Sequence, residues 1–114
     1  MATGTIQKNM VKLWENSSPS SDFAAQDVNI DLSKYSLIVI LFLFTKNDRW
    51  VVPPVVISPS SGQDTFRANT TDNVNAPLSR SGTVSATKVH FDGGYYGGTN
   101  NAMMIPYQIW GIKA

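Results

Sequence analysis

His90 and Asp92 are the residues of this sequence best suited to acid–base or metal chemistry, because they form an H-x-D pair. Side chains two positions apart in a strand lie on the same face, so the two groups could act together. A zinc site needs three or four ligands, and the chain has no cysteine and no second histidine to complete one. We therefore expect an exposed surface pair and no metal site.

Nucleophilic catalysis and glycoside hydrolysis also lack their motifs. A serine could lie beside His90, but the sequence has no G-x-S-x-G elbow, and Ser81-Gly82 is typical of a turn. A glycosidase needs two carboxylates about 5–10 Å apart, and the sequence marks no such pair as buried, with Glu15 as its only glutamate. We predict that the chain is not an enzyme and has no catalytic residue and no cofactor. A hydrolase is the alternative if His90 and Asp92 are buried, or perturbed in pKa, beside a pocket.

The segment from Asp92 to Asn101 is rich in glycine and tyrosine. Its two Gly-Gly pairs lack the Lys-Ser/Thr of a phosphate loop and precede an expected strand rather than a helix, so they indicate a hairpin loop. Loops on a rigid scaffold often carry binding, and this one offers two aromatic rings together with amide and carboxylate groups. A sugar or a protein epitope would suit these groups. The predicted binding residues are Tyr95, Tyr96, Asp92, Asn100 and Asn101.

Charge and composition exclude other classes of partner. The 114-residue chain has nine Lys and Arg against eight Asp and Glu, and the basic residues are dispersed, so we expect no nucleic-acid binding. The longest apolar run, Leu37 to Phe44, is far shorter than the ~20 residues of a spanning helix, so we expect no membrane anchor. The N-terminus lacks the basic-then-apolar order of a signal peptide, and the absence of cysteine fits a reducing cytosol.

Short apolar or alternating runs, separated by Gly, Pro, Asn, Asp and Ser, predict an all-β protein with little or no helix. We expect residues 1–114 to form a single-domain antiparallel β-sandwich, with a small barrel as the alternative. Residues 71–80 are loop-like, apart from a brief strand pairing at Pro77-Leu78, and residues 92–101 form a connection. The expected strands cover residues 6–15, 23–32, 36–45, 50–57, 65–70, 83–92 and 103–113.

The run from Ser36 to Thr45 is apolar at both its odd and its even positions, which predicts a central strand covered on both sides. Pro53 and Pro54 cannot donate hydrogen bonds to a neighbouring strand, so residues 50–57 should form an edge strand or be split by a bulge. The residues expected to anchor the core include Trp14, Trp50 and Trp110, with a protein contact at an exposed Trp50 beside Pro53 and Pro54 as the alternative.

Three stretches resemble one protein family. Leu13–Val28 is similar to the "LW-N-SPTSSFAAQ" opening of small modules in tail-fibre and baseplate proteins of phages and prophages of Gram-positive bacteria. Ile30–Tyr35 and the apolar strand after it resemble the "LDLSDYDAVLI" continuation of these modules, and Met104–Lys113 resembles their closing "IPY-IYGIK". The resemblance spans nearly the whole chain, in the same order.

This resemblance implies a structural or accessory protein of a phage tail tip or baseplate, like the small tail-region proteins of Bacillus siphophages. It implies a jelly-roll-like sandwich, similar to the shoulder domain of lactococcal phage receptor-binding proteins, and no catalytic residues. The implied partners are other tail or baseplate proteins and further copies of the chain in a homo-oligomer of unspecified size. The alternative function is binding of a host cell-wall glycan through the Tyr95/Tyr96 loop. Such a protein is made in the host cytoplasm and takes its place at the virion tail tip.

Overall fold

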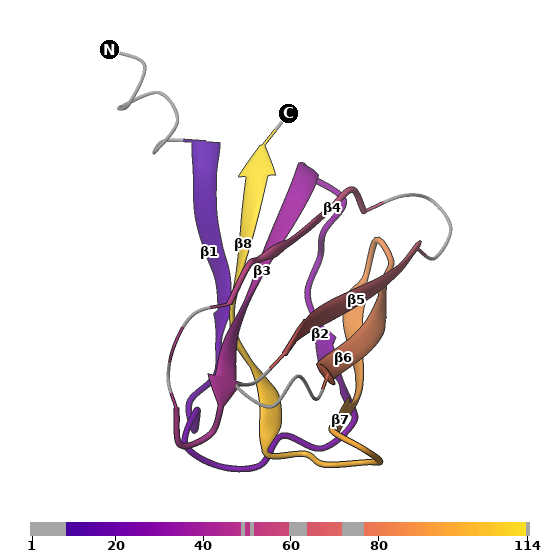
Figure 1. Ribbon diagram of the computed structural model, residues 1–114. Coiled ribbons are helices and arrows are strands. Elements are labelled where there is room, and N and C mark those ends of the chain that lie inside the picture. The colour runs from indigo at the N-terminus through magenta and orange to yellow at the C-terminus, as the bar shows by residue number, and fades with distance from the viewer. Residues whose placement is uncertain (1–8, 49, 51, 60–63, 72–76, 114) are drawn as a thin grey trace.

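The computed structural model describes residues 9–48, 50, 52–59, 64–71 and 77–113. Within these residues the chain forms eight strands, arranged in two sheets that face each other (Figure 1). No helix among them has the length and apolar character that crossing a membrane requires. The strands are β1 (Met10–Glu15), β2 (Gln26–Asn29), β3 (Tyr35–Thr45), β4 (Val55–Ile57), β5 (Asp64–Thr71), β6 (Pro77–Val84), β7 (Lys88–Tyr95) and β8 (Met103–Lys113).

Each sheet has four antiparallel strands. Sheet A has the order β1-β8-β3-β4, and sheet B has the order β2-β7-β6-β5. The first two strands pair with the last two, β1 with β8 and β2 with β7, which is a jelly-roll-like feature. The predicted all-β antiparallel sandwich is confirmed.

Phe91 on β7 lies at the centre of the core between the two sheets and is fully buried. Its contacts with three phenylalanine rings are edge-to-face, an arrangement that the ring quadrupoles favour. The centroid distances are 5.5 Å to Phe23, 5.9 Å to Phe66, 6.1 Å to Phe42 and 6.3 Å to Trp14. Because Phe42 and Trp14 belong to sheet A, this aromatic cluster holds the sheets together.

Of the three tryptophans expected in the core, Trp14 packs against it. Trp50 does not, because its side chain is 65 % exposed and stacks on Phe44 with a centroid distance of 5.3 Å. Trp110 is half-buried and lies across from Lys12 of β1, on the outer side of sheet A. The prediction is therefore right for Trp14 and wrong for the other two, which are large apolar side chains at the surface.

Arg80 on β6 is a charged side chain with no exposed surface. Its guanidinium carbon lies 5.4 Å from the centroid of the Phe23 ring, a cation–π contact. It forms no ion pair with any carboxylate of the described residues. Instead it donates hydrogen bonds of 2.8 to 2.9 Å to the backbone carbonyl oxygens of Phe23, Asp92, Met103 and Met104.

Burial lowers the pKa of Arg80 to about 10, and the charge of Asp92 opposes that shift. The guanidinium therefore keeps its proton near neutral pH, where carbonyl dipoles replace the water that burial removes. Its acceptors lie on β7, on β8 and in the segment before β2. Arg80 thus ties sheet B to the central strand β8 of sheet A.

Two backbone positions are adapted to this arginine. A Cβ atom at Gly94 would overlap the carbonyl oxygen of Asn100 and would lie 3.0 Å from Arg80 Nη2, so glycine permits the close approach. Met104 has a φ of +49°, in the left-handed region that residues other than glycine rarely adopt. The carbonyl of Met104 accepts the bond from Arg80 Nε, so the arginine holds this unusual backbone in place.

Sheet B differs from the predicted strands between residues 71 and 101. Residues 77–84 form β6 rather than a loop, and the expected strand 83–92 is divided between β6 and β7 by a turn at residues 85–87. β6 has no apolar alternation, because its inward positions include Arg80 and Gly82 and its outward positions are mostly serine or threonine. β7 extends to Tyr95, so the connection expected over 92–101 is shorter than predicted.

β3 is central in sheet A, between β8 and β4, and β4 is the predicted edge strand. The prediction that both faces of β3 are covered holds at Leu43, which is 2 % exposed, but is wrong from Leu37 to Leu41, because sheet B packs against one face of sheet A only. On that face Ile38 and Ile40 are fully buried. On the other face Leu37 is 37 % exposed, and Val39 and Leu41 are half-buried.

Replacing Arg80 should destabilise the fold far more than replacing Arg67, an exposed arginine on β5 that serves as the control. Arg80→Ala leaves several buried carbonyl oxygens without a donor, and we expect it to lower the free energy of unfolding by about 3 kcal/mol or more. Arg80→Lys should also destabilise, because a single ammonium cannot reach the same set of acceptors. Urea denaturation measures the change. A wild-type midpoint in Arg80→Ala would contradict the role given to this residue.

Candidate functional site

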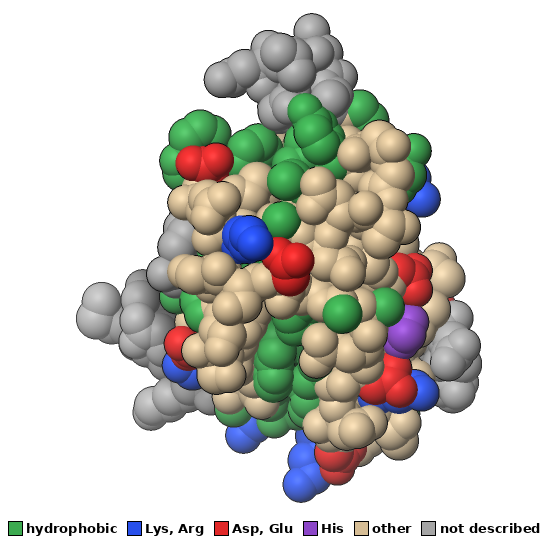
Figure 2. Space-filling model, turned by 90° about the horizontal axis from the view of Figure 1, so that it is seen from below, with side chains coloured by type: hydrophobic (Ala, Val, Ile, Leu, Met, Phe, Trp, Pro, Cys, Tyr) green, Lys and Arg blue, Asp and Glu red, His purple; other side chains and the backbone are tan. Residues whose placement is uncertain are grey.

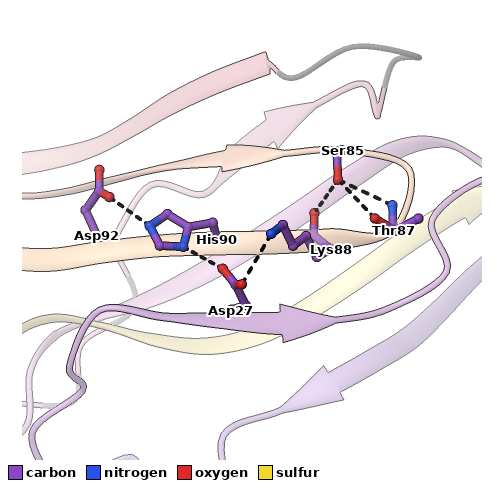
Figure 3. Close-up of polar contacts among 6 residues, drawn as sticks. All are labelled: Asp27, Ser85, Thr87, Lys88, His90 and Asp92. Atoms are coloured by element: carbon purple, nitrogen blue, oxygen red, sulfur yellow. Dashed lines mark hydrogen bonds and ion pairs between the residues drawn. The ribbon is translucent and has the colours of Figure 1, made fainter.

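The outer face of sheet B is polar and carries the H-x-D pair. Asp27 on β2 lies across from His90 on β7, so strand pairing adds a second carboxylate to the pair. His90 Nδ1 lies 2.6 Å from Asp27 Oδ1, and His90 Nε2 lies 3.1 Å from Asp92 Oδ1 (Figure 3). Lys88 joins them with its Nζ 3.3 Å from Asp27 Oδ2. We call Asp27, Lys88, His90 and Asp92 the histidine cluster.

The histidine cluster is exposed and charged. Seen from below, the single histidine lies at the surface with acidic side chains on either side of it (Figure 2). The pKa of Asp27 lies below its ordinary value because of the hydrogen bond from His90, in the first place, and that from Lys88. Both ring nitrogens of His90 face carboxylate oxygens, and both can donate only when the ring is protonated.

This geometry limits the chemistry of the histidine cluster. Among the described residues, no group of three or more His, Asp or Glu side chains is placed to hold a metal ion. The hydrolase alternative requires a buried or perturbed pair, but the side chains of His90 and Asp92 are 37 % and 58 % exposed. Each ring nitrogen of His90 already contacts a carboxylate oxygen, Nδ1 that of Asp27 and Nε2 that of Asp92. The arrangement therefore fits the exposed pair expected from the sequence and gives the hydrolase alternative no support.

The five predicted binding residues separate in the structure. Tyr95, at the end of β7, is 49 % exposed and lines the same hollow as Asp92. Tyr96 packs against the core. The side-chain oxygens of Asn100 and Asn101 accept hydrogen bonds of 3.1 and 3.2 Å from backbone N–H groups, so they hold the turn together. The structure thus places Tyr95 and Asp92 together, and a binding role for the loop stays a prediction.

Arg67 is the residue beside this pair that was not predicted as a site residue. It lies on β5 across from Ser81, and its Nε donates a hydrogen bond of 3.1 Å to Ser81 Oγ. Three hollows of about 430, 360 and 350 Å³ lie on the outer face of sheet B, and Arg67 lines all of them. The alternation of Phe66 and Ala68 with polar residues does place Arg67 on the polar face of a strand. Which strand is its neighbour cannot be read from that pattern. We call the surface lined by Arg67, Ser79, Ser81, Asp92 and Tyr95 the sheet B groove.

The outer face of sheet A is apolar, in contrast to that of sheet B. A groove of about 450 Å³ lies on it, with Trp110 and Leu41 among its lining residues. Val56 of β4, across from Val39, is 56 % exposed. We call this surface the open face; strand pairing places on it the apolar side chains of Met10, Leu37, Val39, Leu41, Val56, Trp110 and Ile112.

The polar groups of the open face pair with one another. Trp110 Nε1 donates to Gln108 Oε1 at 2.9 Å, and Gln108 Nε2 donates to Glu15 Oε1 at 3.3 Å. Glu15 in turn forms an ion pair of 2.6 Å with Lys12, and the pKa of Glu15 is lowered by this partner. The described strands therefore give this face no net charge, because Lys12 and Glu15 form a pair.

Comparisons of the chain with protein-family models, with curated proteins and with solved structures found no match. A β-sandwich by itself does not define a function, because this architecture carries many unrelated ones. The resemblance to phage tail modules, and to the shoulder domain of receptor-binding proteins, therefore stays a prediction from the sequence motifs.

Removing His90 should raise the pKa of Asp27 toward its ordinary value of 3.8, since the hydrogen bond from His90 is the main cause of its lowering. Carboxyl-carbon NMR titration of His90→Ala measures this shift. Lys88→Gln should raise the same pKa less. Asp31 is the control, because its lowered pKa depends on Ser33 and should not move.

The contact between His90 and Asp27 also makes the stability of the fold depend on pH in the acid range. A carboxyl group with a lowered pKa in the folded state stabilises the fold above its unfolded-state pKa. This contribution of Asp27 is lost as the pH falls through the lowered value, and His90→Ala should reduce it to the part that Lys88 supplies. An unchanged Asp27 titration in His90→Ala would show that the contact does not persist in solution.

Proposed function

We propose that this chain is a non-enzymatic structural or accessory protein of a phage tail tip or baseplate, and that it acts by protein–protein contact through the open face. The phage assignment draws on the resemblance of Leu13–Val28 and Met104–Lys113 to tail modules. One structural observation carries the mode of action. β3, the most apolar strand, is fully buried at Ile38 and Ile40 on one face, whereas on the other face Leu37 is exposed and Val39 and Leu41 are only half-buried.

The occupant proposed for the open face is a second copy of the chain. Its charged side chains, Lys12 and Glu15, neutralise each other, so two copies would meet without repulsion between like charges. Several of its polar groups are already hydrogen-bonded within the chain, Trp110 to Gln108, Gln108 to Glu15 and Lys12 to Glu15, so an apolar partner would have few new polar contacts to supply. A two-fold contact would bring the open face of one copy against the open face of the other.

The area of the open face is sufficient for such a contact. One strand residue covers roughly 16 Å² of a sheet, so four strands of 6, 11, 11 and 3 residues cover roughly 500 Å². Two copies would bury about 1,000 Å², which is near the lower limit for a specific interface. Sheets that stack face to face in this way lie about 10 Å apart, as the two sheets of a sandwich do.

A second candidate function is recognition of a host cell-wall glycan. The exposed ring of Tyr95, beside Asp92, favours it. The two functions do not compete, because Tyr95 lies on the outer face of sheet B and self-association would use the outer face of sheet A.

The wild-type chain should have twice its 12.5 kDa mass in light scattering, with dissociation on dilution. Leu41→Lys places a charge among the apolar side chains of the open face and should shift the protein to a monomer while leaving the circular dichroism spectrum unchanged. Thr65→Lys, at an exposed position on sheet B, is the matched control and should remain a dimer. A 12.5 kDa mass at every concentration, or a dimeric Leu41→Lys, would reject self-association through this face.

The tail assignment has a separate test. Mass spectrometry of purified virions, from the phage whose genome encodes this chain, should detect it as a virion component, and immunogold labelling should place it at the tail tip. Virions that contain no copies would reject the structural role.

A further inference from the structure

We infer that the sheet B groove binds a neutral saccharide through Arg67, Asp92 and Tyr95. The largest hollow of this groove has a volume of about 430 Å³, within the usual range of small-molecule sites of about 300–1,000 Å³. Its walls come from three neighbouring strands, β5, β6 and β7, so its side chains stand on a paired sheet rather than on a flexible loop.

Arg67 and Asp92 supply opposite hydrogen-bonding groups to the same hollow. The guanidinium only donates and the carboxylate only accepts, whereas a sugar hydroxyl does both. The two side chains form no ion pair with each other in the described structure, so their charges do not cancel by direct contact. A hydroxyl-rich ligand can therefore accept from Arg67 and donate to Asp92.

The orientation of Arg67 is partly fixed before any ligand arrives. Its Nε donates to Ser81 Oγ, which holds the guanidinium toward β6. Within the described residues, its two terminal amino groups have no hydrogen-bond partner. These groups remain available to a ligand, and Ser79 and Ser81 add hydroxyls that can donate or accept.

Tyr95 provides the apolar part of the site. Its ring is 49 % exposed, and the residue lies across from Ser79 at the rim of two of the hollows. The C–H face of a pyranose can pack on such a ring, while the sugar hydroxyls point toward the polar side chains. One exposed aromatic ring beside a donor and an acceptor is a pattern that suits a sugar better than an apolar ligand.

The charges of the groove favour a neutral ligand over an anion. Arg67 carries one positive charge and Asp92 one negative charge, and Asp27 lies close by through His90. A phosphate or sulfate at Arg67 would meet the carboxylate of Asp92 in the same hollow. A neutral sugar avoids that repulsion and uses both groups.

The test is an NMR titration of the ¹⁵N-labelled full chain with the methyl glycosides of glucose, galactose, mannose and N-acetylglucosamine, with inorganic phosphate as the charged comparison. At least one glycoside should shift the backbone amides of Ser79, Ser81 and residues 92–95 saturably. If phosphate produces these shifts and none of the glycosides does, the ligand of the groove is an anion and not a saccharide. Absence of shifts with all four glycosides, or shifts confined to residues 96–102, would overturn the inference.

Variants test the named side chains. Tyr95→Ala and Arg67→Ala should each weaken the binding of the active glycoside at least tenfold and leave the amide spectrum of the core unchanged. The matched controls are Trp50→Ala, another exposed aromatic ring, and Lys34→Ala, another exposed cation, and both should bind as the wild type does. Full binding by Tyr95→Ala and Arg67→Ala would overturn the assignment. Light scattering of the same samples keeps this result separate from self-association.

Discussion

The arrangement of the described strands depends on the burial of the Arg80 guanidinium. A cation with no exposed surface costs several kcal/mol unless acceptors replace its water, and here the acceptors are backbone carbonyls rather than a carboxylate. Those carbonyls lie where β7 passes β8 and where the chain enters β2, so without the arginine they would lose this donor in buried or half-buried surroundings. The Arg80 side chain therefore finds acceptors for its own N–H groups and supplies donors to the backbone carbonyls of several segments. A displacement of β6 against β8 would break the two bonds to Met103 and Met104 at once.

This constraint also fixes the side chains on the other surface of β7. Arg80 bonds to the carbonyl of Asp92 from the inside of the sandwich, and Gly94 lies against its guanidinium. The side chains of Asp92 and Tyr95 project from the same stretch of β7 to the outside. A ligand in the sheet B groove would thus meet groups whose backbone is already held in place. Less conformational entropy is lost on binding to such a surface, which is how a shallow groove can still bind.

The sequence predicts much of this fold, and its failures have physical causes. Period-two alternation identifies β5, since Phe66 and Ala68 point inward and Arg67 points outward, and the continuous apolar run identifies β3. It misses β6, because a buried arginine held by carbonyls looks like a loop residue in a sequence pattern. It finds His90 and Asp92 but not Asp27, which lies 63 residues from His90 and reaches it through the pairing of β2 with β7. No local sequence pattern predicts a contact between residues that are this far apart in the chain.

The outer face of β3 shows what the apolar run in the sequence predicts. Apolar side chains at every position from Leu37 to Phe44 predict burial on both faces, and the chain itself leaves Leu37, Val39 and Leu41 partly exposed, so the sequence is consistent with a sandwich that is completed by a neighbour. Sheet A would then lie inside a four-layer stack, with each sheet B on the outside. Self-association of this kind leaves both sheet B grooves uncovered and points them in opposite directions. Such a dimer could connect two separate saccharide chains, whereas simultaneous binding of both grooves to one flat surface would be prevented by its geometry.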